Sequence, residues 1–442
     1  MTLALRRFRR FAPAALIAGA SLFVAVNDSR AQQPLTLQAV LTYAHEHSPR
    51  LAASRENVET QQAGVETAKA ERLPRLDFGT AFRGSNLLTE TALGFPLTPF
   101  ADLPQNQPFA QGHLNAGVFA TLPVYTGGRI KSATELAQAH RELAQVSVQD
   151  VERNLDFDVT STYAHIVELD RDVQAARESV KALTESQRIV DQMLGVGKVA
   201  RVDRLKVVAR LADVQSTLID FTNAREIEAG QLNALMGRAV DTPVVVETTL
   251  PQQPAPVSLP ELPRAAATGN TKYQIAQAQL NVAEHSVDVA KSDLRPSVSL
   301  AANFLAQSAD PFSAYKGGAI GGVVFSFPLF DRTRNHEVEE AKSRELERQS
   351  EATQAKLDAM QRTRTAYLQI QDAEERIRAT QAAIGSAREA LRIEQEKQRY
   401  GRTIIENVLD AQAALLTSEA DYYRALADHT IAVAALKRET GR

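Results

Sequence analysis

The feature that most limits the possible folds is an uninterrupted helical pattern from Arg332 to Arg399. This stretch has no proline, and Gly385 is its one interior glycine. Its apolar residues recur in alternating steps of four and three, which is the a/d pattern of a coiled coil. At ~1.5 Å per residue the helix would be roughly 100 Å long, which favours a rod over a compact globule. The seam positions are Ala366, Ile370, Ala373, Ile377, Thr380, Ile384, Ala387 and Leu391.

A second segment repeats this pattern. Between Arg129 and Leu194 the chain has neither glycine nor proline, and its apolar residues keep the same rhythm. Two rods of similar length indicate an internal duplication. The second set of seam positions is Leu155, Val159, Thr162, Ile166, Leu169, Val173, Ala176, Val180, Leu183, Gln187, Val190 and Leu194.

Residues 1–31 have the pattern of a secretory signal peptide. Four arginines between residues 6 and 10 precede an apolar segment from Phe11 to Val26, and Ser29-Arg30-Ala31 fits a small-x-small cleavage site. An N-terminal membrane anchor is the alternative, although the apolar segment is shorter than the ~20 residues that a spanning helix needs. Beyond this leader there is no apolar run of about 18 residues, so no transmembrane helix is predicted.

Composition argues against several classes of function. The formal net charge of -3 argues against a nucleic-acid-binding protein, which normally carries a basic excess. The chain has no cysteine, which excludes disulfides, thiolate zinc sites and a cysteine nucleophile. No glycine-rich phosphate loop or nucleophile elbow occurs, and His45-Glu46-His47 lacks the i, i+4 histidine pair of a helical zinc site. We therefore expect neither enzymatic activity nor a cofactor.

Four segments change to a period of two, which predicts strands with one apolar and one polar face. They form two hairpins, at about 75–123 and about 297–330. A proline-rich stretch from Gly84 to Gln111 separates the first pair and is too long for an ordinary hairpin loop. The loop of the second pair is predicted to pass through Asp310-Pro311 and Gly317-Gly318, before a last strand over Val323, Phe325, Phe327 and Leu329.

The order of elements divides the chain. We predict a signal peptide at 1–31, a first structural repeat at 32–238, a proline-rich equatorial linker at 239–270 and a second repeat at 271–442. Each repeat consists of a helix, a hairpin, a long helix and a returning helix. The predicted fold is therefore mainly α, with a small β part at one end of the rods.

The strands suggest a membrane pore shared among several copies. Each has roughly the ten residues that a tilted strand needs to cross a bilayer. Four strands cannot close a barrel, and an open sheet edge is not viable in hydrocarbon, so three copies would supply a barrel of 12 strands. The helices would continue this barrel as a coiled-coil tunnel. A soluble β-sandwich and a fibrous dimer are the alternatives.

Short motifs at the ends of the rods support this interpretation. Leu122-Pro123-Val124-Tyr125 precedes Gly127-Gly128, and Phe327-Pro328-Leu329-Phe330-Asp331 stands at the matching place in the second half. At the far ends lie Val196-Gly197-Lys198 and Gly401, followed by Asn407-Val408-Leu409-Asp410-Ala411-Gln412. In this order the chain resembles the TolC-type outer membrane efflux channels, or outer membrane factors, from about Leu35 to Gly441.

The resemblance implies a homotrimer in contact with outer-membrane lipid, with four transmembrane strands per chain and a periplasmic helical extension. It also implies two protein partners, a periplasmic adaptor protein and an inner-membrane transporter. The function would be passive export of small molecules or polypeptides through the exit duct of a tripartite efflux or type I secretion system. A coiled-coil adaptor and an autonomous porin or structural envelope protein remain alternatives, and the cargo is not encoded in a recognisable motif.

The resemblance also points to a periplasmic gate. Asp410 matches a position where such channels place an acidic ring, whereas the companion acidic position is Asn407 here. Asp203 matches a residue that helps to hold the mouth closed, but the matching arginine is replaced by Thr403. A solvated helix carboxylate is the alternative for Asp410. Whether Glu406 lines the pore is left open.

Two tight reversals at the rod tips are the expected docking sites for the adaptor. They are Val196, Gly197 and Lys198 in the first half, and Tyr400, Gly401 and Arg402 in the second. Glycine at a helix reversal also has a purely conformational explanation, because the turn often needs a positive φ. Docking at these tips is therefore implied by the resemblance alone.

Overall fold

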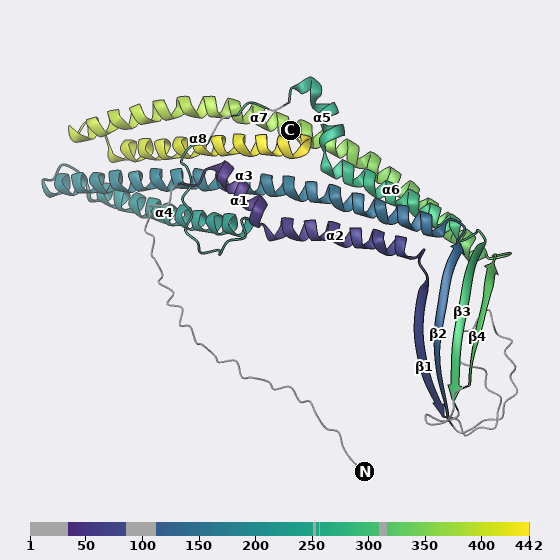
Figure 1. The fold of residues 1–442 in the computed structure, drawn as a ribbon. Helices are drawn as coiled ribbons and strands as arrows, with labels where there is room; N and C mark the ends of the chain where they lie inside the picture. The colour runs from purple at the N-terminus through teal and green to yellow at the C-terminus, as the bar shows by residue number, and fades with distance from the viewer. Residues whose placement is uncertain (1–33, 85–111, 251–252, 256, 309–315, 442) are drawn as a thin grey trace, which may run out of the picture.

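The computed structural model describes residues 34–84, 112–250, 253–255, 257–308 and 316–441. The predicted signal peptide and nearly all of the proline-rich stretch between Gly84 and Gln111 lie outside these residues. Figure 1 shows long helices side by side, with a small sheet at one end of them. The helices are α1 (Leu37–His47), α2 (Pro49–Ala70), α3 (Arg129–Gly195), α4 (Arg201–Leu235), α5 (Leu262–Gly269), α6 (Thr271–Ser292), α7 (Arg332–Arg399) and α8 (Ile405–Thr440), with a short 3-10 turn at Leu259–Glu261.

The two predicted rods are present as α3 and α7, of 67 and 68 residues. Their predicted seam positions face neighbouring helices: Leu155 and Val159 of α3 are fully buried, as is Ala373 of α7. The steps of four and three place the apolar residues on one face of each helix, and this face packs on the neighbouring helices. The coiled-coil prediction is therefore confirmed for both rods within one chain.

Shorter helices flank each rod. α4 runs back along the distal half of α3, and α8 runs back along α7, so that each pair forms a helical hairpin. Near the sheet, α2 packs on α3, and α6 lies between α3 and α7. The main contact between the two hairpins is that of α3 with α8.

The strands β1 (Arg75–Gly84), β2 (Gly112–Tyr125), β3 (Ser297–Ser308) and β4 (Lys316–Ser326) form one antiparallel sheet in the order β1-β2-β3-β4. The register places residues of even number in β1, β2 and β3 on one face, together with odd-numbered residues of β4. This face is apolar and uncovered: Leu76, Phe78 and Phe325 are 70%, 73% and 68% exposed. A β-sandwich would bury such a face, so that alternative is wrong for the described chain.

The last strand differs from its prediction. β4 ends at Ser326, so Phe327 and Leu329 lie beyond the sheet, while Gly317 and Gly318 belong to the strand rather than to the loop. Ser326 pairs with Ser297, the first residue of β3, and no β3 residue remains to pair with those that follow. In the first half, by contrast, β2 continues to Tyr125 through a bulge after Pro123. Alternation alone does not reveal where the partner strand stops.

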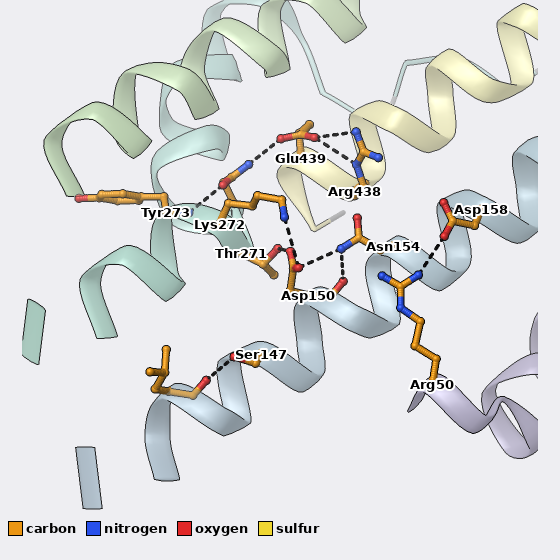
Figure 2. Close-up of polar contacts among 12 residues, drawn as sticks. Arg50, Ser147, Asp150, Asn154, Asp158, Thr271, Lys272, Tyr273, Arg438 and Glu439 are labelled. Carbon is orange, nitrogen blue, oxygen red and sulfur yellow. Dashed lines mark hydrogen bonds and ion pairs between the residues drawn. The ribbon is translucent and has the colours of Figure 1, made fainter. Parts of the chain in front are cut away.

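The middle of the molecule holds the two repeats together. α5 is a helix within the predicted linker, and proline at its start is compatible with its first turn. Figure 2 shows the polar network at this joint, where Thr271 Oγ1 donates to Asp150 Oδ1 of α3 at 2.6 Å. Asn270 caps α6 and donates from Nδ2 to Glu439 Oε2 of α8 at 2.7 Å. One short segment thus links α3, α6 and α8.

Candidate functional site

Both rods reverse at the end farthest from the sheet, and the two reversals have the same backbone structure. Gly197 has φ +72° and Gly401 has φ +67°. The N–H of Gly197 donates to Leu194 O at 3.0 Å, and that of Lys198 to Met193 O at 2.8 Å. This pair of hydrogen bonds is the Schellman motif, which uses a left-handed residue to end a helix.

The second tip repeats the motif. Gly401 N–H donates to Gln398 O at 2.9 Å, and Arg402 N–H donates to Lys397 O at 2.8 Å. An added Cβ on either tip glycine would meet open space, so the requirement for glycine comes from the backbone angle and not from packing. The glycines are thus explained without a partner.

The residues predicted to dock an adaptor lie on the surface of these tips. Val196 is 70% exposed and Tyr400 is 76% exposed, so both side chains are available for contact. The guanidinium of Arg402 lies 5.9 Å from the Tyr400 ring, within the range of a cation–π contact. The tips therefore present apolar and cationic groups together. Docking at them stays a prediction.

The predicted gate residue Asp203 has a local role in this structure. Its Oδ2 accepts a hydrogen bond from the Ala200 N–H at 3.0 Å, at the start of α4. The carboxylate also lies in the first turn, where it is favoured by the helix dipole. A link from Asp203 to a neighbouring tip stays a prediction, and the cap gives Asp203 a reason to be acidic without that link.

Asp410 and Glu406 lie on the first turns of α8, beside α4. Lys206 Nζ of α4 is 2.7 Å from Glu406 Oε2, which joins the two hairpins at their tips. Hydrogen bonding and charge from Glu406 raise the pKa of Lys206, with smaller contributions from Asp203 and Asp410. The structure thus gathers Asp203, Asp410 and Glu406 around one lysine.

Lys206 was missed in the sequence analysis, although one signal could have indicated it. It lies three residues after Asp203 on α4, so the two side chains share a face of the helix. Its partner, Glu406, lies 200 positions further along the chain, and no local sequence pattern indicates that the two residues pair. For Glu406 the structure shows a partner on α4 of the same chain.

Asn407 and Thr403 form a second polar chain within the α7–α8 hairpin. Asn407 Nδ2 donates to Thr403 Oγ1 at 3.1 Å, and the Thr403 hydroxyl donates to Glu394 Oε2 at 2.6 Å. These bonds tie the start of α8 to the end of α7. Thr403, which replaces the expected arginine, therefore links the two helices of its own hairpin.

An apolar cluster supports the polar groups of both tips. It brings together buried residues of α3, α4, α7 and α8, and Val207 and Leu183 are almost fully buried. Deeper along the rods, Gln412 Nε2 of α8 donates to Ser179 Oγ of α3 at 3.3 Å. Tip positions are thus coupled to the packing of one hairpin on the other. The cluster consists of Leu183, Val190, Val207, Val214, Leu391, Ile405, Val408 and Leu409.

The histidines of the sequence His45-Glu46-His47 have different partners. His45 Nε2 lies 2.5 Å from Asp156 Oδ1 of α3, whereas the His47 ring stacks on Tyr43 at 4.1 Å. Across the described part of the chain, no group of three or more His, Asp or Glu side chains is arranged to hold a metal ion. None of the helices in the described ranges is long and apolar enough to cross a bilayer.

A family model, a related protein and several solved structures match this chain. The family model described as "Outer membrane efflux protein" matches residues 40–238 and 262–442. The cobalt-zinc-cadmium resistance protein CzcC of Cupriavidus metallidurans is 23% identical over 331 residues, which cover 74% of this chain and 70% of CzcC. Matches to solved structures, at lower identity, show the same fold.

Two of these structures illustrate the extent of the match. The outer membrane protein VceC of Vibrio cholerae superimposes with a TM-score of 0.74 at 17% identity, over 92% of this chain and 96% of VceC. A membrane protein of Pseudomonas aeruginosa gives a TM-score of 0.77 at 17% identity, over 92% of this chain and 93% of its own. The fold is therefore shared with these proteins over most of the chain.

Proposed function

This chain belongs to the outer membrane efflux protein family, and from that premise we propose that three copies form a passive exit duct through the outer membrane and periplasm. The four strands of each copy would contribute to a common barrel of 12 strands, within the range of outer-membrane barrels. The helices would continue the barrel as a periplasmic tunnel. The chain would conduct its cargo without catalysing a reaction.

The observation that carries this proposal is the uncovered sheet at one end of the rods. Its apolar face is suited to lipid, because Phe78 and Phe325 are largely exposed in the single chain. Among the described residues, its outer strands β1 and β4 each pair on one side, which leaves their other edges to pair with another copy. Backbone groups in hydrocarbon need such partners, and closure by neighbouring copies would supply them.

Engineered cysteines test this closure directly, because the natural chain contains none. Asp77→Cys on β1 and Val324→Cys on β4 lie on opposite edges of the sheet, near its helical end. A short bismaleimide added to membranes should link the double variant into a species of three chains on a denaturing gel. Each single variant serves as the control and should remain one chain. Membrane-inserted double variant that stays monomeric would contradict the shared barrel.

We further propose that the tips dock a periplasmic adaptor, which connects the duct to an inner-membrane transporter. The exposed Val196 and Tyr400, with Lys198 and Arg402 beside them, support such a surface. Photo-crosslinkers at Lys198 and Arg402 should capture the adaptor in cells. A crosslinker at Glu347, exposed on α7 far from both tips, is the control. Equal capture from all three positions, or capture from none, would refute docking at the tips.

The acidic residues at the tips, Asp203 and Asp410, would line the narrowest part of the duct. Three copies of Asp410 around one axis would favour cations, and the Lys206–Glu406 pair would hold the two hairpins of each copy together in the closed state. Single-channel recordings of Asp410→Ala and Asp203→Ala test this gate. Conductance and closure unchanged in both variants would remove these residues from the gate.

For the cargo, the name of CzcC suggests which compounds to test first. CzcC is a cobalt-zinc-cadmium resistance protein, and we propose divalent metal ions as the first cargo class to examine here. A strain lacking this gene should become sensitive to cobalt, zinc or cadmium. Sensitivity to organic toxicants alone would reassign the cargo while leaving the duct in place. Cell fractionation distinguishes the two hypotheses for the protein itself: a duct should be found in the outer membrane, whereas a soluble adaptor should not.

A further inference from the structure

A buried carboxylate lies in the contact between the two helical hairpins. Asp172 of α3 is 3% exposed, and its Oδ1 atom has no hydrogen-bond partner among the described residues. It faces α8, so it lies where the α3–α4 hairpin packs on the α7–α8 hairpin. Burying a charged carboxylate without a partner is costly. The charge state of Asp172 therefore affects how firmly the hairpins pack.

The charged groups around Asp172 compensate its charge only in part. Glu168 lies one turn earlier on α3, and Asp421 lies on α8. The nearby cation, Arg424 of α8, has its Nε 3.5 Å from Glu168 Oε1 and is thus shared with that residue. Burial, reinforced by Glu168 and Asp421 and opposed by Arg424, raises the pKa of Asp172 to about 7.

Other charged groups around this point have partners of their own. Arg225 of α4 lies 3.0 Å from Asp170, and Arg171 donates to the backbone oxygen of Thr248 at 2.7 Å. His165 lies 3.3 Å from Glu168, which raises the pKa of this histidine. Glu228 of α4 and Asp428 of α8 act on His165 in the same direction, and Asp428 also pairs with Arg376 of α7 at 2.9 Å. His165 is therefore the titrating neighbour that an experiment must separate from Asp172.

We propose that Asp172 is a proton-operated switch, in which loss of its proton weakens the packing of α3 on α8 and shifts the hairpins toward an open tip. The step from hairpin packing to tip opening rests on the proposed channel function, whereas the change in packing does not. The tips are included because Lys206 and Glu406 join the same two hairpins there.

The sign and size of the effect follow from proton linkage. A carboxyl with a raised pKa in the packed state binds its proton more tightly there, so the packed state weakens as the pH rises from about 4 to about 7. Separation of α3 from α8 would return the group to its ordinary pKa of 3.8. The ratio of separated to packed hairpins should then rise about 50-fold between about pH 5 and about pH 7.

A single tryptophan can report this contact, because the chain contains none. The ring of Tyr423 on α8 lies 5.4 Å from the guanidinium of Arg171 on α3, so Tyr423→Trp places the probe at the interface. In this background, emission from the full-length protein in detergent should shift to longer wavelength as the pH rises from about 5 to about 7. Adding Asp172→Asn should abolish the shift, because the amide has the shape of the carboxyl and no charge.

Adding His165→Gln instead is the matched control and should leave the shift intact. A shift that survives Asp172→Asn, or that disappears with His165→Gln, would overturn the proposal. Equal melting temperatures at about pH 5 confirm that Asp172→Asn folds as the parent does. Single-channel recordings then test the second step: opening should increase with pH in the parent but not in Asp172→Asn. A shift in emission without this change overturns the link to the tip, whereas absence of any conductance overturns the channel itself.

Discussion

Two glycines of the second hairpin should respond to the same substitution in opposite directions. Gly401 forms the tip with φ +67°, and Gly385 lies inside α7 with helical backbone angles. An alanine Cβ would meet no atom within 4 Å at either position. Packing within the chain therefore contributes to neither effect, and backbone conformation decides the sign.

The expected magnitudes follow from that difference. At Gly401 an L-residue in the left-handed region costs roughly 1–2 kcal/mol, so Gly401→Ala should destabilise the tip. At Gly385 alanine replaces glycine in a helix interior and should stabilise the local helix by roughly 0.5–1 kcal/mol. Because the two free-energy changes differ in sign, each variant is the control for the other.

Amide hydrogen exchange of the assembled protein measures both effects locally. Exchange of the amides that end α7 should become about 5- to 30-fold faster in Gly401→Ala, since 1–2 kcal/mol corresponds to that factor. Exchange around residue 385 should become about 2- to 5-fold slower in Gly385→Ala. Changes of the same direction in both variants, or protection at the tip unaffected by Gly401→Ala, would refute the conformational argument.

Three further predictions concern the core, the tip and the joint between repeats. Ile370→Ala, at a seam position that is 1% exposed, should lower the free energy of unfolding by roughly 2–5 kcal/mol in denaturant titrations, and a loss below that of an exposed Leu368→Ala variant would contradict the buried seam. Glu406→Gln should increase channel opening at low salt, and the difference should vanish near ~1 M salt because the Lys206–Glu406 pair is solvent-exposed; a salt-independent effect would argue against the pair. Asn270→Ala should cost about 1 kcal/mol through loss of the α6 cap, in addition to the lost hydrogen bond to Glu439. The loss of the cap should be seen as faster exchange at Tyr273, and unchanged exchange there would show that the cap is dispensable.

Local patterns were sufficient for most of the architecture. The seams of α3 and α7, the reversals at Gly197 and Gly401 and the duplicated order of elements all depend on residues a few positions apart. Helical periodicity and glycine conformation act over that range, so they can be recognised without knowledge of the fold. The same applies to the alternation in the strands, which correctly indicated their apolar face.

Other features depended on partners that are distant in the chain. The end of β4 is set by where β3 begins, and α5 is a short helix within a segment that its prolines had suggested was irregular. At the tip, the pairing of Lys206 with Glu406 comes from the packing of one hairpin on the other.

The sequence by itself therefore determined the rods, the tips and the sidedness of the sheet, because periodicity and chain reversals are local properties. Tertiary structure decided which charges meet and which are buried, as for Asp172 between α3 and α8. The reason is physical: the energy of a charge depends on all the groups and solvent around it, and those surroundings exist only when distant segments have packed together.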